Sequence, residues 1–169
     1  MLIKTQVPKL DEVLDGGIQS KSNVLIFSDP EIKGLQFLHQ LIYNFLQSGY
    51  KVAYLTNNKK PAILKHFFKE YDWNVSKFEK NKKFMIINLF DKASKKIDIN
   101  ALHQEIKDSI NKLPPNTVLV IDSLSSFIDI YGTDNESLNI ANHIIENSKN
   151  LTTITLFTSW SYKRSIINK

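Results

Sequence analysis

The sequence predicts an α/β fold in which a parallel sheet is covered on both faces by helices. Short apolar stretches with strand character alternate with longer stretches of helical periodicity along the chain. The expected strands at 24–27 and 118–121 are almost entirely apolar, as strands buried on both faces are. No repeat, linker or low-complexity segment interrupts the 169 residues, so we expect a single domain over 1–169.

The expected elements alternate from residue 24 onward. A short helix at 9–14 precedes them and should end at Gly16-Gly17, where a positive φ costs little. Strands are expected at 24–27, 51–56, 84–89, 118–121 and 152–158. Helices are expected from about Ile32 to Ser48, from Pro61 to Tyr71, from Ile99 to Leu113 and from Glu136 to Lys149. Pro61 suits the first turn of its helix, and Pro114-Pro115 end the helix before them.

Composition narrows the functional classes. Apolar residues make up 42% of the chain and charged residues 23%, as in ordinary globular proteins. The absence of cysteine removes disulfides and thiolate chemistry. No stretch approaches the roughly 20 apolar residues of a membrane helix, and the N-terminus lacks the pattern of a signal peptide, so we expect a cytoplasmic protein. The net charge of +5 is compatible with nucleic acid without demanding it.

A phosphate loop would lie between the strand at 24–27 and the next helix, at the carboxyl edge of the sheet where such folds bind ligands. The pattern G-x-x-x-x-G-K-[S/T] supplies backbone N–H groups and a lysine for the phosphates, and a hydroxyl for Mg²⁺. This chain reads Ser28-Asp29-Pro30-Glu31-Ile32-Lys33-Gly34-Leu35 in that window. The chain therefore has a segment at the position of the phosphate loop, but this segment does not match the phosphate-binding pattern.

Several motifs together resemble the RecA-like core of KaiC-type and RadA-type ATPases. They are Leu10-Asp11-x-x-Leu14-Asp15-Gly16-Gly17-Ile18, His39 to Asn44 with Gly49 to Tyr54, Pro61 through Asp72-Trp73-Asn74, Val118 to Ser126, and Leu151 to Ser159. The resemblance covers nearly the whole chain. It implies a three-layer α/β/α core with a mainly parallel five-stranded sheet in the order 3-2-4-1-5. It also divides the chain into an N-terminal segment 1–22, a core 23–159 and a tail 160–169.

The departures from that family concern the nucleotide site. In the ungapped register, Ser28 and Glu31 replace two loop glycines, Lys33-Gly34 inverts the glycine-lysine pair, and Leu35 replaces the Mg²⁺-binding hydroxyl. Glu31 also carries negative charge toward the phosphates, which costs on the order of several kcal/mol. The glutamate that activates water in the family falls at Asn58 or Lys59, and neither is a carboxylate base.

Asp122-Ser123 resembles the Walker B end of the fourth strand, and two roles remain open for it. We expect a catalytically silent RecA/KaiC-like domain without a cofactor, in which this aspartate is structural. Such a domain would act as an assembly or regulatory subunit, with a protein partner or as a homo-oligomer, and the RadA likeness suggests DNA recombination or repair. The alternative is a KaiC-like ATPase that binds ATP and Mg²⁺ through Lys33 and Asp122.

Two surfaces are expected to bind other molecules. The strand at 152–158 should leave an edge of the sheet open to pairing or covered by the tail. After it come Trp160, Tyr162, Lys163 and Arg164, which combine aromatic rings with cations and would suit single-stranded DNA. The other interpretation is a tail that packs Trp160 against protein. The four histidines lack ligand spacing and the serines lack a histidine partner, so neither a metal site nor a serine nucleophile is expected.

Overall fold

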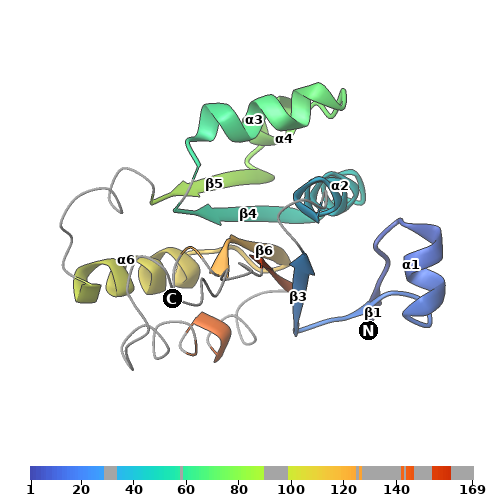
Figure 1. Cartoon of the computed structure of the whole chain (residues 1–169), viewed down its shortest axis with the longest axis horizontal. Coiled ribbons are helices and arrows are strands. Elements are labelled where there is room, and N and C mark those ends of the chain that lie inside the picture. The colour runs from blue at the N-terminus through green and yellow to red at the C-terminus, as the bar shows by residue number, and fades with distance from the viewer. Residues whose placement is uncertain are drawn as a thin grey trace, which may run out of the picture.

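The fold is a five-stranded parallel sheet between two layers of helices (Figure 1). The computed structural model describes residues 1–28, 34–57, 59–89, 99–124, 126, 142, 144–146 and 154–160. The strands are, in sheet order, β3 (Ser22–Ser28), β7 (Ile154–Trp160), β6 (Thr117–Asp122), β4 (Lys51–Thr56) and β5 (Phe84–Asn88). All four neighbouring pairs are parallel, which confirms the predicted fold class.

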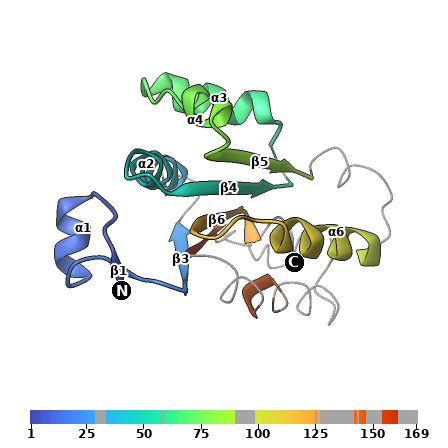
Figure 2. The same ribbon diagram turned by 180° about the vertical axis from the view of Figure 1, so that it is seen from behind.

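Two apolar clusters hold the helices on the sheet. On one face lie α2 (Gly34–Gln47), α3 (Pro61–Glu70) and α4 (Ser76–Lys80), as Figure 1 shows. The cluster on this face includes the fully buried Phe45, Tyr54 and Phe68. On the other face lies α6 (Ile99–Asn111), as Figure 2 shows. Its Ile106 belongs to the same buried cluster as Leu119 of β6. Successive strand residues alternate between the two clusters, because side chains of a strand point to opposite faces in turn.

The strand order differs from the expected one at a single place. In the expected numbering the observed order is 3-2-4-5-1, so β7 lies between β3 and β6 instead of at the edge. Ile154, Thr155 and Leu156 of β7 are fully buried, whereas Leu25 and Phe27 of β3 are 55% and 62% exposed. A strand buried on both faces belongs inside a sheet, and this burial accounts for the position of β7. The expectation that the strand at 152–158 lies at an edge was therefore wrong, and among the described strands β3 takes that edge position.

The helix boundaries agree with the sequence to within a few residues, and two features were missed. The missed ones are α4 and a two-stranded antiparallel sheet of β1 (Leu2–Ile3) and β2 (Ile18–Gln19). The helix expected at 136–149 lies mostly outside the described residues, although 142 and 144–146 are helical. No helix in the described ranges is long and apolar enough to cross a membrane.

The N-terminal motif is held together by Asp11 of α1 (Pro8–Val13). Its carboxylate accepts hydrogen bonds from Thr5 N at 2.8 Å, Thr5 Oγ1 at 2.7 Å and Gln6 N at 3.1 Å. Burial opposes ionisation, but these hydrogen bonds and Lys4 outweigh it, and the pKa of Asp11 is lowered. Gly17 has a φ of 141°, and a Cβ there would collide with the carbonyl of Ile3. The conformation of this turn therefore requires glycine.

Candidate functional site

Asp122, at the carboxyl end of β6, is the centre of the candidate site. Its side chain is fully buried. Oδ2 accepts hydrogen bonds from Tyr54 OH at 2.5 Å and from Lys59 Nζ at 2.7 Å, and Oδ1 accepts one from Thr158 Oγ1 at 3.0 Å. Both carboxylate oxygens therefore already have donors from the protein itself.

The sheet register brings these donors together. Thr56 of β4 lies opposite Asp122, so Tyr54, two residues earlier, points to the same face. Thr158 belongs to β7, the neighbour of β6 on its other side. Lys59 follows the end of β4, and its ammonium group contacts the carboxylate of Asp122. Two strands and one connecting segment thus converge on a single aspartate.

The charge of Asp122 is balanced by a cation that is itself largely buried. The side chain of Lys59 is 15% exposed, against 0% for Asp122. Burial, the charge of Asp122 and the hydrogen bond to it raise the pKa of Tyr54 well above its usual value. Tyr54 therefore remains a neutral donor, and Lys59 supplies the positive charge.

A second group of polar side chains lies beside the pair. Ser126 Oγ donates to Asn57 Oδ1 at 2.6 Å and lies 3.0 Å from Ser123 Oγ. The backbone N–H of Ser126 donates to Ser123 Oγ at 3.2 Å, and the peptide bond between Asp122 and Ser123 is cis. Asn57 is 3% exposed, and its amide nitrogen has no hydrogen-bond partner within the described part of the chain. These hydroxyl groups bond to one another and to an amide, so they stabilise the turn after β6.

His39 of α2 lies in the apolar layer behind the ion pair. Its ring centroid is 4.7 Å from that of Phe68 and 6.2 Å from that of Tyr54. Burial lowers the pKa of His39 to about 4; the charge of Asp122 opposes this shift and that of Lys59 adds to it. The imidazole is therefore neutral near pH 7, and its Nε2 is buried without a hydrogen-bond partner among the described residues. No group of three or more His, Cys, Asp or Glu residues that could hold a metal ion occurs in the described ranges.

The two ends of the phosphate-loop window meet at Ser28 and Gly34. A Cβ built on Gly34 would lie 2.5 Å from Ser28 Cβ and even closer to Ser28 Oγ. The side chain of Ser28 thus fills the space at position 34. Leu35 packs against the apolar cluster under α2. Asp29, Pro30, Glu31, Ile32 and Lys33 lie outside the described residues.

The other predicted site residues are only partly placed. Asp122 and Ser123 lie together and are fully buried. Trp160 is the last residue of β7. Asn58, Tyr162, Lys163 and Arg164 lie outside the described residues.

Asn57 and Thr158 follow or end the strands expected at 51–56 and 152–158, at the sheet edge where a ligand site was expected. Tyr54 was missed, and the available signal was its place two residues before the end of a strand, on the same face as Thr56 by the alternation of strand residues. The resulting arrangement is a buried, hydrogen-bonded ion pair. Each oxygen of its aspartate accepts at least one hydrogen bond from a protein side chain.

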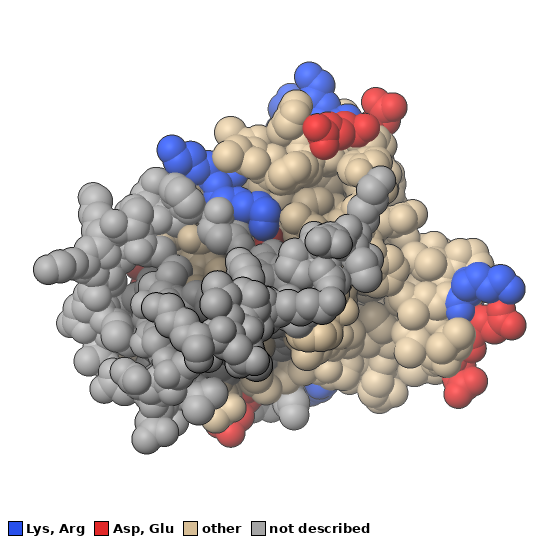
Figure 3. All heavy atoms as spheres, in the orientation of Figure 1, with Lys and Arg blue, Asp and Glu red and all other residues tan. Residues whose placement is uncertain are grey.

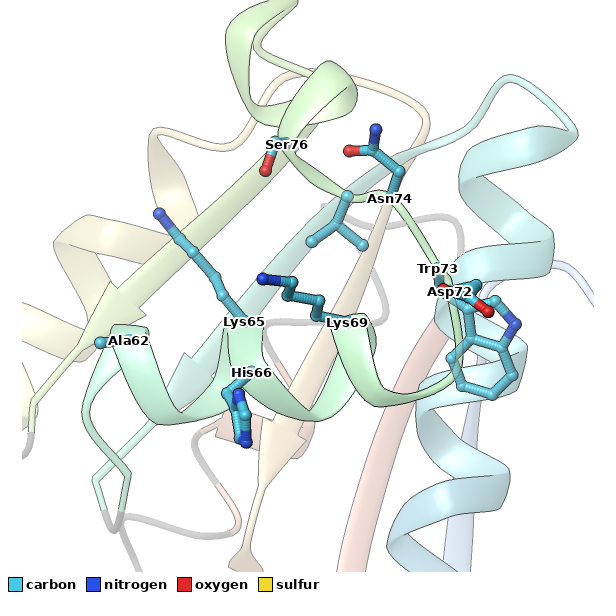
Figure 4. Close-up of a pocket in the computed structure, with 9 residues that line it drawn as sticks. Ala62, Lys65, His66, Lys69, Asp72, Trp73, Asn74 and Ser76 are labelled. Carbon is cyan, nitrogen blue, oxygen red and sulfur yellow. The ribbon is translucent and has the colours of Figure 1, made fainter.

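A pocket beside α3 is separate from this site. It has a volume of about 730 Å³ and lies between α3 and residues 72–76. Figure 4 shows Lys65 and Lys69 pointing from α3 toward the segment with Asn74 and Ser76. Lys65 Nζ lies 2.6 Å from Glu79 Oε1 of α4, so this lysine bridges the two helices.

The chain is similar in sequence to proteins of the UPF0273 group, and similar in fold to two solved structures. A UPF0273 protein of Thermotoga maritima is 38% identical over 88 residues, which are 52% of this chain and 36% of that protein. A UPF0273 protein of Saccharolobus solfataricus is 30% identical over 140 residues, covering 73% of this chain and 48% of that protein. The chain therefore spans less than half the length of these two curated relatives.

Two solved structures have the same architecture. A KaiC-like protein of Pyrococcus horikoshii superposes with a TM-score of 0.73 at 20% identity, covering 95% of this chain and 71% of that one. The flagellar accessory protein FlaH of Methanocaldococcus jannaschii gives a TM-score of 0.71 at 18% identity, with the same coverage of 95% and 71%. Residues 3–167 match the family described as "ATPase: KaiC". The chain therefore belongs to the KaiC family of RecA-like proteins.

Proposed function

We propose that this chain is a single KaiC-like domain that acts by binding a protein partner or another copy of itself and does not hydrolyse ATP. One observation carries the proposal: Lys59 Nζ lies 2.7 Å from Oδ2 of the Walker B-like Asp122. Lys59 occupies one of the two positions at which the family resemblance expects the water-activating glutamate. A cation therefore stands where hydrolysis needs a base.

The ion pair also opposes metal binding at Asp122. An aspartate that assists Mg²⁺ must offer an oxygen to the ion or its waters. In this chain Tyr54 and Lys59 share Oδ2, and Thr158 takes Oδ1. Metal binding would require Lys59 to leave, and two cations at one carboxylate would repel each other. The internal ammonium group makes an external ion unnecessary for charge balance.

The phosphate-loop window supports the same conclusion. The loop lysine of the family pattern falls at Gly34, and Ser28 fills the space at that position. The hydroxyl of the pattern falls at Leu35, which packs into the apolar core. The described residues at both ends of the window therefore lack the groups that bind phosphate and Mg²⁺.

The alternative is a KaiC-like protein that binds ATP through an unorthodox loop with Lys33 and Asp122. This alternative differs from the proposal in one requirement: Lys59 must release Asp122 when ATP and Mg²⁺ bind. A phosphate-release assay with Mg²⁺ and ATP separates the two functions. We expect no phosphate release above the protein-free blank. Release that grows with protein concentration and disappears in Asp122→Asn would overturn the proposal.

A nucleic-acid function rests on the sequence alone. The cluster Trp160, Tyr162, Lys163 and Arg164 suits a single strand, since stacking on an aromatic ring contributes about 1–3 kcal/mol per base. On the face shown in Figure 3, basic side chains over α1 adjoin acidic ones, and the described atoms form no continuous basic stripe. Titration of a labelled single-stranded oligonucleotide with wild type and Trp160→Ala/Arg164→Ala tests this prediction. Equal binding by both proteins would refute it.

A further inference from the structure

The sheet ends at β3 without a described neighbour on its outer side. β3 pairs with β7 through all seven of its residues, and no other described strand pairs with it. In a parallel pair, alternate residues direct their backbone N–H and C=O groups to one neighbour. The remaining residues of β3 therefore direct theirs to the open side, which is a template for another strand.

This edge carries none of the features that usually prevent pairing. The strand reads Ser22-Asn-Val-Leu-Ile-Phe-Ser28, with no charged residue and no proline. Leu25 is 55% exposed and Phe27 is 62% exposed. The opposite edge, β5, is directly preceded by Lys82 and Lys83. Proteins that keep an edge unpaired tend to place lysine, proline or a bulge there.

An apolar groove runs along the same edge. It has a volume of about 710 Å³ and lies between β3, the segment from α1 to β2, and α2. Its lining includes Leu10, Leu14, Ile18, Val24 and Phe37. Leu25 and Phe27 are exposed on the opposite face of the strand from Val24 and Ile26, which pack toward the α2 side. A strand added at this edge would thus find apolar surface on both of its faces.

We infer that the occupant is a second copy of this chain, paired antiparallel through β3 about a two-fold axis at Leu25. In that register Leu25 faces Leu25 of the other copy, Val24 faces Ile26, and Ser22 faces Ser28. The sequence is therefore close to self-complementary about its centre, as an isologous interface requires. The inference depends on the proposed function only in that the chain acts by binding.

Charge favours the antiparallel direction. Lys21 precedes the strand in the sequence and Asp29 follows it. Antiparallel pairing directs the basic end of each strand toward the acidic end of the other, whereas parallel pairing brings like ends together. Opposite charges across a strand pair are favourable, and like charges are destabilising. The partner's Val24 and Ile26 would enter the groove, and its Leu25 and Phe27 would cover the exposed apolar side chains.

The experiment is sedimentation velocity over a range of protein concentrations, without nucleotide. We expect wild type to dimerise and Leu25→Lys and Leu25→Glu each to raise the dissociation constant at least tenfold, since each places like charges opposite each other at the axis. Mixing the two variants should restore a dimer, because the lysine of one variant then faces the glutamate of the other. Ile63→Lys is the matched control: Ile63 is 50% exposed on α3 and should not affect association.

Three outcomes would overturn the inference. They are a wild type that remains monomeric at all accessible concentrations, a dimer that Leu25→Lys leaves intact, and two charged variants that fail to associate when mixed. Circular dichroism of each variant confirms that the fold is retained; Leu25 is exposed, so neither substitution buries a charge in the monomer. A negative result here leaves the phosphate-release assay unaffected, so the two proposals fail independently.

Discussion

Ser28 fills the space into which a side chain at position 34 would extend, so the sizes of these two residues are linked. A Cβ on Gly34 would lie 2.5 Å from Ser28 Cβ. The phosphate-binding pattern has the opposite arrangement, with glycine at the first position and lysine at the seventh. In this chain the side chain is at position 28 and the glycine is at position 34. A lysine introduced at position 34 alone would therefore collide with Ser28.

Gly34→Ala should therefore destabilise the fold, and Ser28→Gly should suppress the effect. Overpacking of this kind costs about 1–3 kcal/mol, whereas glycine in a strand costs roughly 0.5–1 kcal/mol. Urea unfolding of both single variants and of Ser28→Gly/Gly34→Ala measures the coupling as a double-mutant cycle. Strictly additive free energies would show that the two residues do not compete for space.

Lys59→Met should lower the free energy of unfolding by about 3 kcal/mol, because it leaves the buried carboxylate of Asp122 without its cation. Lys59→Met/Asp122→Asn should recover part of this loss, since the neutral amide no longer needs a counter-charge. The measurement is chemical denaturation near pH 7.

Lys65→Met provides the matched control for this prediction. Lys65 lies 2.6 Å from Glu79, but both side chains are over a third exposed. Removing an exposed pair should cost less than about 1 kcal/mol. Equal losses for Lys59→Met and Lys65→Met would mean that burial of the Asp122 pair has no energetic consequence.

His39 should make the fold sensitive to mild acid. Its pKa is lowered from 6.5 to about 4, so the fold favours the neutral imidazole. The contribution to stability is complete above pH 6.5 and is lost as the pH falls toward 4, with a total of about 3 kcal/mol. The free energy of unfolding, measured from pH 7 to pH 4, should therefore fall less steeply in His39→Leu than in wild type.

The control for His39 is His66→Leu on α3. The side chain of His66 is 68% exposed, so replacing it removes no buried imidazole. This variant should keep the loss of stability between pH 7 and pH 4 that burial of His39 produces. If His39→Leu also matches wild type, the buried imidazole is not the source of the acid sensitivity.

The layers of the fold could be predicted because hydrophobic periodicity reports burial directly. Apolar residues of β4 and β6 alternate between two cores, and the helical stretches show one apolar face each. Strand order is a different property, since it depends on which strands lie side by side. The position of β7 follows from burial of Thr155 and Thr158, whose hydroxyls look polar in sequence but are enclosed in the structure.

The candidate site was only half visible in the sequence. The sequence did single out both Asp122 and Lys59. It presented Asp122 as a carboxylate without a partner, and Lys59 as one of two positions where the family's glutamate is missing. Their pairing depends on the path of the chain after β4, which no local pattern encodes. The hydrogen bonds of Tyr54 and Thr158 could not be predicted for a similar reason: each residue becomes a donor to Asp122 only when the neighbouring strands are in register.

Thermal unfolding with and without Mg²⁺ and ATP tests the central claim most directly. A ligand at 100 times its dissociation constant stabilises a fold by about 2.7 kcal/mol, which is about 5–10 °C in melting temperature for a chain of this size. With Lys59 holding Asp122 and Ser28 filling the space at Gly34, we expect no change in melting temperature. A rise of several degrees that needs both Mg²⁺ and ATP, and that Asp122→Asn abolishes, would contradict the account.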